Sequence, residues 1–270
     1  MTRPYADVIG DPIAHSKSPV IHGFWLDALG IEVEYRKTRI TPDELGAYFE
    51  ARKADPDWRG CNITIPHKQA ALDWVGDPGG VRESIGAINT VVRGEDGALI
   101  GTNTDAGGFY APIAGLELEG AHAVVIGAGG AARAVLFALA RVGIGRVTIQ
   151  NRNVLKAAAL LSSFGIKGDA VPLGTKLPPA TLLVNASALG MTGQPPLDLD
   201  LSPLPEAAVV YDAVYAPLET ELLAQAHDRG LDTVDGLEML VGQAALAFEL
   251  FFGAEPPRNR DEELRALLTA

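Results

Sequence analysis

Cysteine pairs and long apolar runs are both missing from this chain of 270 residues. The single cysteine, Cys61, cannot form an intrachain disulfide, which fits a reducing compartment, and a small buried side chain is its simplest role. The most apolar late stretch, Ala244 to Phe252, contains Glu249 and is far shorter than the roughly 20 residues that cross a bilayer. The first residues show no apolar segment with a cleavage site, so we expect a cytoplasmic protein without a membrane partner.

Positive charge is also scarce, because 22 Lys and Arg stand against 34 Asp and Glu, which gives a net charge of −12 at pH 7. Such a surface repels nucleic acids and anionic membranes, so neither is expected as a partner. An anionic small molecule would need local cations or backbone N–H groups. Low-complexity tracts and repeats are absent too, and 30 glycines and 18 prolines spread along the chain indicate turns between many short elements.

The pattern of apolar residues predicts two successive α/β series. In the first, strands are predicted at 5–10, 33–40, 60–65 and 86–93, helices at 19–30, 42–54 and 66–75, and a hairpin turn at Glu95-Asp96-Gly97. A joining helix at about 104–115 leads to the second series. Its strands are predicted at 121–126, 146–150, 181–185, 208–212 and 231–234, and its helices at 131–142, 153–164 and 219–229. This alternation predicts a doubly wound parallel sheet, followed by helices at 236–253 and from about 260 onward.

A glycine-rich turn follows the first strand of the second series. Gly127 allows a tight turn, Gly129 lets the backbone approach a pyrophosphate, and the small Ala132 permits close packing of helix on strand. Free N–H groups and the helix dipole would face the phosphates. An ordinary strand–helix turn is the alternative, and the combination of strand, motif and helix favours a dinucleotide site.

The end of the next strand indicates which dinucleotide is bound. An NAD enzyme usually carries an acid here for the ribose 2′-hydroxyl, whereas this chain has Asn151, Arg152 and Asn153. A carboxylate would repel a 2′-phosphate, and a guanidinium can bind it, so the sequence favours NADP over NAD. Lys156 could assist one turn later, although a surface lysine is the simpler interpretation.

Three positions could carry the chemistry of a second ligand. Ser18 lies before a predicted helix, where it could bind an anion or only cap the helix. Pro66 suits a first helical position and would put Lys68 in the first turn, where the dipole disfavours a cation. A lysine so placed could have a lowered pKa and transfer protons, and a solvent-facing lysine is the alternative. Asp105 opens the next helix, and an N-cap role is the simple alternative unless Lys68 faces it across a cleft between the two units.

Taken in order, these motifs resemble the shikimate dehydrogenase family over nearly the whole chain. The resemblance is carried by the segments Ser16–Pro19, Asn62–Lys68, Gly86–Thr90, Asn103–Asp105, the glycine loop, Asn151–Arg152, Asn185–Met191, Asp212–Tyr215 and Asp235–Gln243. It implies NADP-dependent, metal-free, reversible reduction of 3-dehydroshikimate to shikimate. It also implies that the C-terminal helices pack on the N-terminal domain, so we expect a substrate domain of residues 1–103 with 237–270 and an NADP domain of 104–236.

The resemblance assigns roles by position. Lys68 and Asp105 would be catalytic, and Ser16 and Ser18 would bind the shikimate carboxylate. The other residues around the ring would be Thr64, Asn89, Tyr215 and Gln243. The cofactor would be held by Gly127, Ala128, Gly129, Gly130, Ala131, Asn151, Arg152, Asn153, Lys156, Ala213 and Gly236.

Three positions depart from the family pattern, namely Gly23 in place of Asn, Cys61 in place of Val and Asn153 in place of Thr, and none removes a catalytic group. Two alternatives stay open at this point. A quinate/shikimate dehydrogenase that prefers NAD is one, and a non-catalytic NADPH-binding sensor is the other. The expected partners are small molecules, and the chain is expected to be a monomer or a homodimer.

Overall fold

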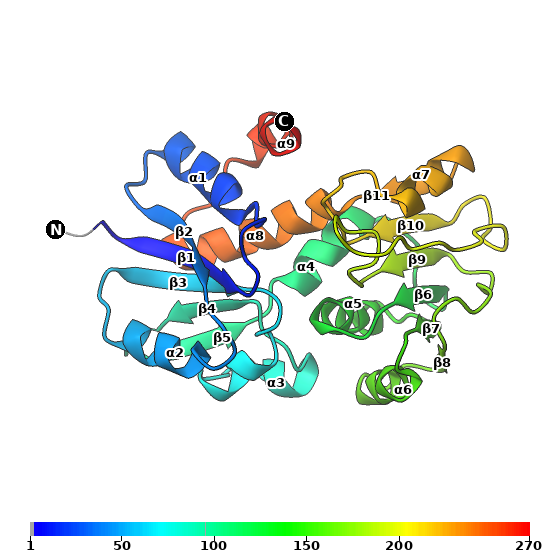
Figure 1. The fold of residues 1–270 in the computed structure, drawn as a ribbon, viewed down its shortest axis with the longest axis horizontal. Helices are drawn as coiled ribbons and strands as arrows, with labels where there is room; N and C mark the ends of the chain where they lie inside the picture. The colour runs from blue at the N-terminus through cyan, green and yellow to red at the C-terminus, as the bar shows by residue number, and fades with distance from the viewer. Residues whose placement is uncertain (1–2, 95) are drawn as a thin grey trace. The chain divides into compact units, whose positions relative to one another are not determined.

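The computed structural model describes residues 3–94 and 96–270, which form two compact units (Figure 1). Unit 1 comprises the described residues up to Thr104 together with Val241–Ala270, and unit 2 comprises Asp105–Leu240. The divisions fall at residues 104 and 241, where the sequence predicted 103 and 237. Unit 1 is therefore discontinuous in the chain, because its last helices follow unit 2.

A five-stranded mixed sheet in the order β2-β1-β3-β4-β5 forms the centre of unit 1. Strands β1 (Tyr5–Gly10), β2 (Glu34–Arg39) and β3 (Trp58–Ile63) run parallel, and β4 (Thr90–Arg93) and β5 (Leu99–Thr102) add an antiparallel hairpin. Of the predicted hairpin turn, Glu95 lies outside the described residues. The carboxyl ends of β1, β2, β3 and β5 and the amino end of β4 meet at one edge of the sheet.

Helices cover both faces of this sheet. The rings of His22 and Trp25 on α1 (Ser18–Leu29) pack 5.9 and 5.5 Å from that of Phe248 on α8 (Gly236–Phe252). The guanidinium of Arg260 lies 4.7 Å from the ring of Phe24, next to α9 (Asp261–Thr269). Helix α2 (Leu45–Lys53) packs on the opposite face through Tyr48, and α3 (Val81–Ser84) is short. The C-terminal helices thus pack within unit 1, as the resemblance implies.

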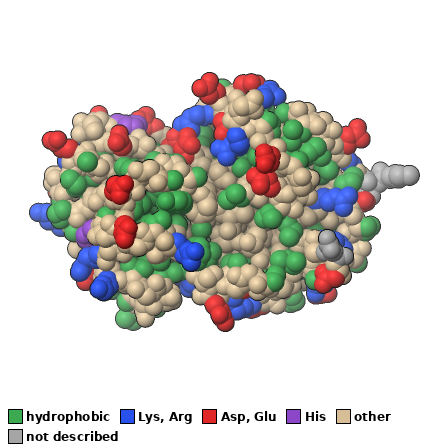
Figure 2. Space-filling model, turned by 180° about the vertical axis from the view of Figure 1, so that it is seen from behind, with side chains coloured by type: hydrophobic (Ala, Val, Ile, Leu, Met, Phe, Trp, Pro, Cys, Tyr) green, Lys and Arg blue, Asp and Glu red, His purple; other side chains and the backbone are tan. Residues whose placement is uncertain are grey.

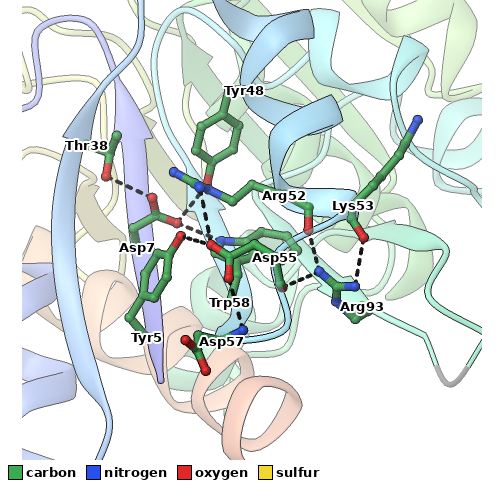
Figure 3. A network of polar contacts seen from close by, with 10 residues as sticks. All are labelled: Tyr5, Asp7, Thr38, Tyr48, Arg52, Lys53, Asp55, Asp57, Trp58 and Arg93. Atoms are coloured by element: carbon green, nitrogen blue, oxygen red, sulfur yellow. Dashed lines mark hydrogen bonds and ion pairs between the residues drawn. The ribbon is translucent and has the colours of Figure 1, made fainter. Parts of the chain in front are cut away.

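A buried carboxylate ties α2 to the strands, as Figure 3 shows. Asp7 on β1 is fully buried and accepts hydrogen bonds from Tyr48 at 2.7 Å, Trp58 at 3.1 Å and Thr38 at 2.8 Å. Burial raises the pKa of Asp7, and the three hydrogen bonds oppose this. Arg52 points toward this group and also pairs with Asp55 at 3.5 Å.

The helix predicted at 66–75 is wrong. The chain instead forms hydrogen-bonded turns after β3 and a 3-10 helix at Ala70–Asp73. The carbonyl of Lys68 accepts from the N–H of Ile88 at 2.7 Å rather than from a residue one turn ahead. Tertiary hydrogen bonds therefore override the local helical pattern. The strand predicted at 86–93 is also shorter, since β4 begins only at Thr90.

The six-stranded sheet of unit 2 is fully parallel, in the order β11-β10-β9-β6-β7-β8. Counted along the chain, this is the 3-2-1-4-5-6 order of a doubly wound dinucleotide-binding fold. The predicted doubly wound parallel sheet is confirmed. The strands are β6 (His122–Ile126), β7 (Arg146–Gln150), β8 (Gly168–Val171), β9 (Leu182–Asn185), β10 (Val209–Asp212) and β11 (Asp232–Val234).

Apolar side chains alternate along these strands and feed two cores, one on each face of the sheet. Ala123 and Val125 of β6 pack with α4 (Asp105–Tyr110), α5 (Gly130–Arg141) and α6 (Val154–Ser163). Val124 and Ile126 face α7 (Glu221–Asp228) and the connection before β10. The topological switch point of the sheet lies between β6 and β9.

Two expectations for unit 2 need correction. The joining helix predicted at 104–115 is shorter, since α4 ends at Tyr110 and a 3-10 helix continues over Ala111–Ile113. Pro112 has no N–H to donate, which explains the end of the α-helix. Strand β8 was not predicted, because its residues Gly168 and Asp169 are exposed and give no apolar pattern.

Two surface properties bear on the expected partners, namely the distribution of charged side chains and the apolarity of the helices. On the face in Figure 2, acidic and basic side chains are interspersed, and no broad area of one sign is seen among the described residues. No helix in the part of the chain that the structure describes has the length and apolarity needed to cross a membrane.

Candidate functional site

The predicted substrate residues of unit 1 lie at one edge of its sheet. The register places Gly10 beside Arg39, Ile9 beside Ile63, and Thr90 beside both Asn62 and Thr102. The segments that follow or precede these positions carry Ser16, Ser18, Thr64, Lys68 and Asn89. The strand order therefore gathers side chains that are far apart in the sequence.

The serine segment is attached to the end of β3. The N–H of Asp11 donates to the carbonyl of Ile65 at 3.0 Å, and the N–H of Thr64 donates to Ile9 at 2.9 Å. Ser18 is buried and is the first residue of α1. The N-cap residue is Lys17, and its side chain makes no capping hydrogen bond. Ser16 Oγ accepts from the N–H of Ser18 at 3.3 Å. Ser18 is therefore not the N-cap residue that the sequence suggested.

The side-chain amide of Asn89 forms hydrogen bonds with three buried residues, Thr90, Thr104 and Gln243. Its Nδ2 donates to Thr104 Oγ1 at 2.8 Å and to Gln243 Oε1 at 3.2 Å. Its Oδ1 accepts from the N–H of Thr104 at 2.7 Å and from Thr90 Oγ1 at 3.1 Å. Asn89 itself is buried too. The network fixes the orientation of two amides, Asn89 and Gln243, that the sequence assigned to the substrate.

A second chain of contacts leads from this network into the core. Asn62 donates to Thr90 Oγ1 at 3.1 Å and accepts from the hydroxyl of Tyr35 at 2.5 Å. Tyr35 stacks on His22 with ring centroids 4.0 Å apart. The position of Asn89 thus depends on Asn62, Tyr35 and His22, which were not predicted as site residues.

Lys68 is partly buried in the turns that follow β3. No α-helix begins at Pro66, so Lys68 does not lie in the first turn of a helix, and its predicted place against a helix dipole is wrong. The structure instead attaches its backbone to Ile88, next to Asn89. Asp105 is buried and opens α4, as predicted. A meeting of Lys68 and Asp105 stays a prediction.

The predicted cofactor residues of unit 2 lie at the carboxyl edge of its parallel sheet. Gly127 follows β6 with a φ of +105°, and a Cβ there would stand 3.0 Å from the carbonyl of Ala186. A Cβ on Gly129 would meet nothing within 4 Å, so the space above this glycine is open. Gly130 begins α5, which directs its free N–H groups toward this turn. The local geometry fits a pyrophosphate.

A pocket lies beside this turn. It is lined by the predicted residues Gly127, Asn151 and Arg152, and also by Ile126, Gln150, Leu173, Ser187, Ala188, Leu189, Gln194 and Pro195. No acidic side chain is among these described lining residues. A free ribose 2′-hydroxyl needs a carboxylate as acceptor, and none is among these residues. The pocket therefore suits the 2′-phosphorylated adenosine of NADP better than the adenosine of NAD.

The segment after β7 presents exposed polar groups. Asn153 is the N-cap of α6, where its Oδ1 accepts from the N–H of Lys156 at 3.0 Å. Asn151 Nδ2 donates to the carbonyl of Asn153 at 2.8 Å. Arg152 and Lys156 are both exposed on this segment. Two cations and a helix N-terminus therefore lie at the edge where a 2′-phosphate is expected.

A buried carboxylate organises the neighbouring loops. Asp212 at the end of β10 accepts from Asn185 at 2.9 Å, from Thr220 at 2.7 Å and from the N–H of Val214 at 2.9 Å. Burial raises the pKa of Asp212, and these bonds oppose the rise. The loop that they hold carries the predicted residues Ala213 and Tyr215. Burial also raises the pKa of Tyr215.

Comparison with known proteins adds an independent observation to this geometry. The chain is 68% identical over 267 residues, 99% of this chain and 97% of the relative, to the "Shikimate dehydrogenase (NADP(+))" of Sphingopyxis alaskensis. The chain belongs to the shikimate dehydrogenase family. Three family models match it: "Shikimate dehydrogenase substrate binding domain" over residues 8–91, "Shikimate / quinate 5-dehydrogenase" over 111–177 and "Shikimate 5'-dehydrogenase C-terminal domain" over 236–263.

Solved structures of the shikimate dehydrogenase family share the two-domain fold. The Thermus thermophilus shikimate 5-dehydrogenase in complex with NADP(H) and shikimate has a TM-score of 0.87 and 38% identity, covering 98% of this chain and 99% of that chain. The quinate dehydrogenase of Corynebacterium glutamicum in complex with NAD has a TM-score of 0.85 and 30% identity, covering 98% and 99%. Family membership and fold alone therefore do not separate shikimate from quinate.

Several residues that line or support the candidate sites were not identified from the sequence. Ser187 and Leu189 line the pocket and follow a predicted parallel strand, so their place at its carboxyl end could have been inferred. Leu173 follows the strand that had no apolar pattern. Thr90 and Thr104 hold Asn89 through contacts that only the folded chain creates.

Proposed function

We propose that the chain catalyses the reversible, NADP-dependent reduction of 3-dehydroshikimate to shikimate. The observation that carries the proposal is the 68% identity with the Sphingopyxis alaskensis enzyme over 99% of the chain. The gathered polar side chains at the edge of unit 1 and the nucleotide-type turn of unit 2 support it. A net charge of −12 further supports the expectation of small-molecule partners rather than nucleic acid or an anionic membrane. A cytoplasmic location is part of the same proposal.

The proposed roles follow the chemistry of the ring acid. The hydroxyls of Ser16 and Ser18 would bind its carboxylate, and Thr64, Asn89, Tyr215 and Gln243 would surround the ring and its hydroxyls. NADPH, when bound, supplies a hydride from C4 of its nicotinamide to C3 of the ring. Lys68 would donate the proton to the oxygen on C3 and accept it again in the reverse direction, with Asp105 beside it.

The cofactor proposal rests on the open space at Gly129 and on the charge of the neighbouring segment. Gly127 to Ala131 would hold the pyrophosphate on backbone N–H groups. Arg152 would bind the 2′-phosphate, with Asn151, Asn153 and Lys156 near it, and Ala213 and Gly236 would lie nearer the nicotinamide. Arg152 is exposed and can rotate to meet a phosphate.

A panel of shikimate and quinate, each with NADP or NAD, tests the proposal with the purified protein. We expect the highest kcat/KM for shikimate with NADP. The second candidate is a quinate dehydrogenase that uses NAD, which the Corynebacterium glutamicum neighbour favours. Turnover of quinate with NAD above that of shikimate with NADP would establish the second candidate. Binding of NADPH without any turnover would indicate a sensor.

A further inference from the structure

Hydrogen bonds join the ends of the first three strands of unit 1. The N–H of Ile40, after β2, donates to the carbonyl of Gly10 at the end of β1 at 3.2 Å. The N–H of Asp11 donates to the carbonyl of Ile65, after β3, at 3.0 Å. These are backbone bonds, which any sequence could supply. They leave the segment after β3 without a bond to β2.

The side chain of His67 supplies that bond. Its Nε2 lies 2.6 Å from the carbonyl oxygen of Ile40, 27 positions earlier in the chain. A carbonyl oxygen only accepts, so Nε2 carries the proton and donates it. His67 is 1% exposed, so the hydrogen bond is shielded from water.

The hydrogen bond of His67 acts directly beside Lys68. The carbonyl of Lys68 accepts from the N–H of Ile88 at 2.7 Å. His67 and Lys68 are therefore held from two sides, by Ile40 after the end of β2 and by Ile88. No regular α-helix forms at residues 65–69, where the chain makes turns. The tertiary contacts therefore hold Lys68 together with local bonds of His67, whose N–H donates to Thr64 at 3.0 Å and whose carbonyl accepts from Ala71 at 2.9 Å.

We propose that His67 is a positioning residue for Lys68, which it holds at the reacting oxygen through the carbonyl of Ile40. This inference rests on the proposed function, in which Lys68 transfers the proton. His67 contacts neither substrate nor cofactor in this role. Small displacements of an acid–base group lower the rate of the chemical step while binding of the distant cofactor is kept.

The test compares four single variants with the full-length wild type. His67→Phe keeps a ring of similar size without the donor. His67→Gln places an amide N–H near the position of Nε2, and His67→Asn carries the same amide one methylene short. His122→Phe is the control, because it removes another histidine hydrogen bond, the one between Nε2 and Thr148 Oγ1 at 2.9 Å in unit 2.

We expect kcat for shikimate oxidation to fall about tenfold or more in His67→Phe and His67→Asn, with KM for NADP within about twofold. His67→Gln should recover kcat to within about threefold of wild type, and His122→Phe should leave it unchanged. A thermal melt of each variant separates a loss of stability from a loss of rate, because a merely structural role would lower the melting temperature and leave kcat near that of the wild type.

Two results overturn the inference while the proposed function stands. One is a kcat within about threefold of wild type in both His67→Phe and His67→Asn. The other is a His67→Gln variant as slow as His67→Asn although it melts at the wild-type temperature. Absence of wild-type turnover with shikimate and NADP would instead refute the proposed function and, with it, the reaction that this inference concerns.

Discussion

The amide nitrogen of Asn89 donates a hydrogen bond to Oε1 of Gln243 across 3.2 Å, between residues 154 positions apart in the chain. Gln243 lies on the part of α8 that belongs to unit 1, so this bond joins the late helix to the edge of the first sheet. Thr104 contacts the same amide. The two side chains therefore orient each other before any substrate arrives.

Gln243→Met tests this pair, because methionine has a similar length and no hydrogen-bonding amide. We expect KM for shikimate to rise about tenfold, which corresponds to roughly 1.4 kcal/mol, since one proposed contact is lost and Asn89 loses an acceptor. Steady-state kinetics measure this, with KM for NADP unchanged. Leu246→Gln, on the exposed side of α8, is the control. An unaltered KM would remove Gln243 from the substrate site.

Lys68→Ala tests the proposed proton transfer. We expect kcat to fall roughly 100-fold or more, because a general acid–base group of this kind contributes about that factor. Nucleotide binding should be kept, and titration of the protein with NADPH followed by fluorescence measures it. Lys53→Ala replaces an exposed lysine paired with Glu50 and should leave kcat unchanged. Near-normal turnover by Lys68→Ala would refute the role of Lys68.

The sequence predicted unit 2 well because the signals there are local. The strand, turn and helix around Gly127 are continuous in the chain, and the parallel order places Arg152 at the same edge without further information. Strand β8 was missed, where exposed Gly168 and Asp169 hide the pattern, and the joining helix was predicted too long. A site built at the ends of consecutive parallel strands can be predicted from their order alone.

The site of unit 1 is less predictable because its shape depends on contacts between distant residues. The segment at Lys68 has a helical pattern, yet His67 bonds to Ile40 and the Lys68 carbonyl bonds to Ile88. Neither partner can be inferred from the spacing of apolar residues. Gln243 reached the predicted site through family resemblance, and the structure supplies the bond to Asn89 that explains its place.

Arg152→Ala tests the choice of nucleotide. We expect KM for NADP to rise at least about tenfold, because a charge-assisted bond to the 2′-phosphate is lost, while KM for NAD changes little. Kinetics with both nucleotides at saturating shikimate measure the ratio. Arg141→Ala removes an exposed arginine from the end of α5 and serves as control. Equal changes for both nucleotides would mean that Arg152 does not contact the phosphate.

Substitution of Asp7 separates its charge from its hydrogen bonds (Figure 3). Asp7→Leu leaves the donors of Tyr48, Trp58 and Thr38 without an acceptor and should lower the free energy of unfolding by at least about 3 kcal/mol. Asp7→Asn keeps one oxygen for Tyr48 and Trp58, and the Thr38 hydroxyl can rotate to accept. We therefore expect Asp7→Asn to be far milder in urea denaturation.

The difference in unfolding free energy between the wild type and Asp7→Asn should depend on pH. Burial raises the pKa of Asp7 above its value of 3.8 in the unfolded chain, so the folded state binds the proton more tightly. The contribution of Asp7 to stability is then largest below pH 3.8 and falls as the pH rises through the folded pKa. Asp7→Asn should gain stability relative to wild type between pH 4.5 and 7.5, and a constant difference would contradict this.

The buried ring of His22 should lower the stability of the wild type as the pH falls, whereas Asp7 lowers it as the pH rises, and His22→Phe tests this. His22 is fully buried against Tyr35, and neither ring nitrogen has a partner with hydrogen-bond geometry among the described residues. Burial lowers the pKa of His22 to about 3, and nearby Asn62 opposes this only in part. The unfolded chain binds the proton near pH 6.5, so the wild type loses stability as the pH falls from 6.5 toward 3.

Phenylalanine has no proton to gain, and its ring can keep the stack on Tyr35. Relative to its difference from wild type at pH 7.5, His22→Phe should gain roughly 2 to 3 kcal/mol of unfolding free energy at pH 4.5. Urea denaturation at the two pH values measures this gain, with His15→Gln at an exposed position as control. A gain below about 1 kcal/mol would mean that the buried ring of His22 takes up a proton within the folded protein.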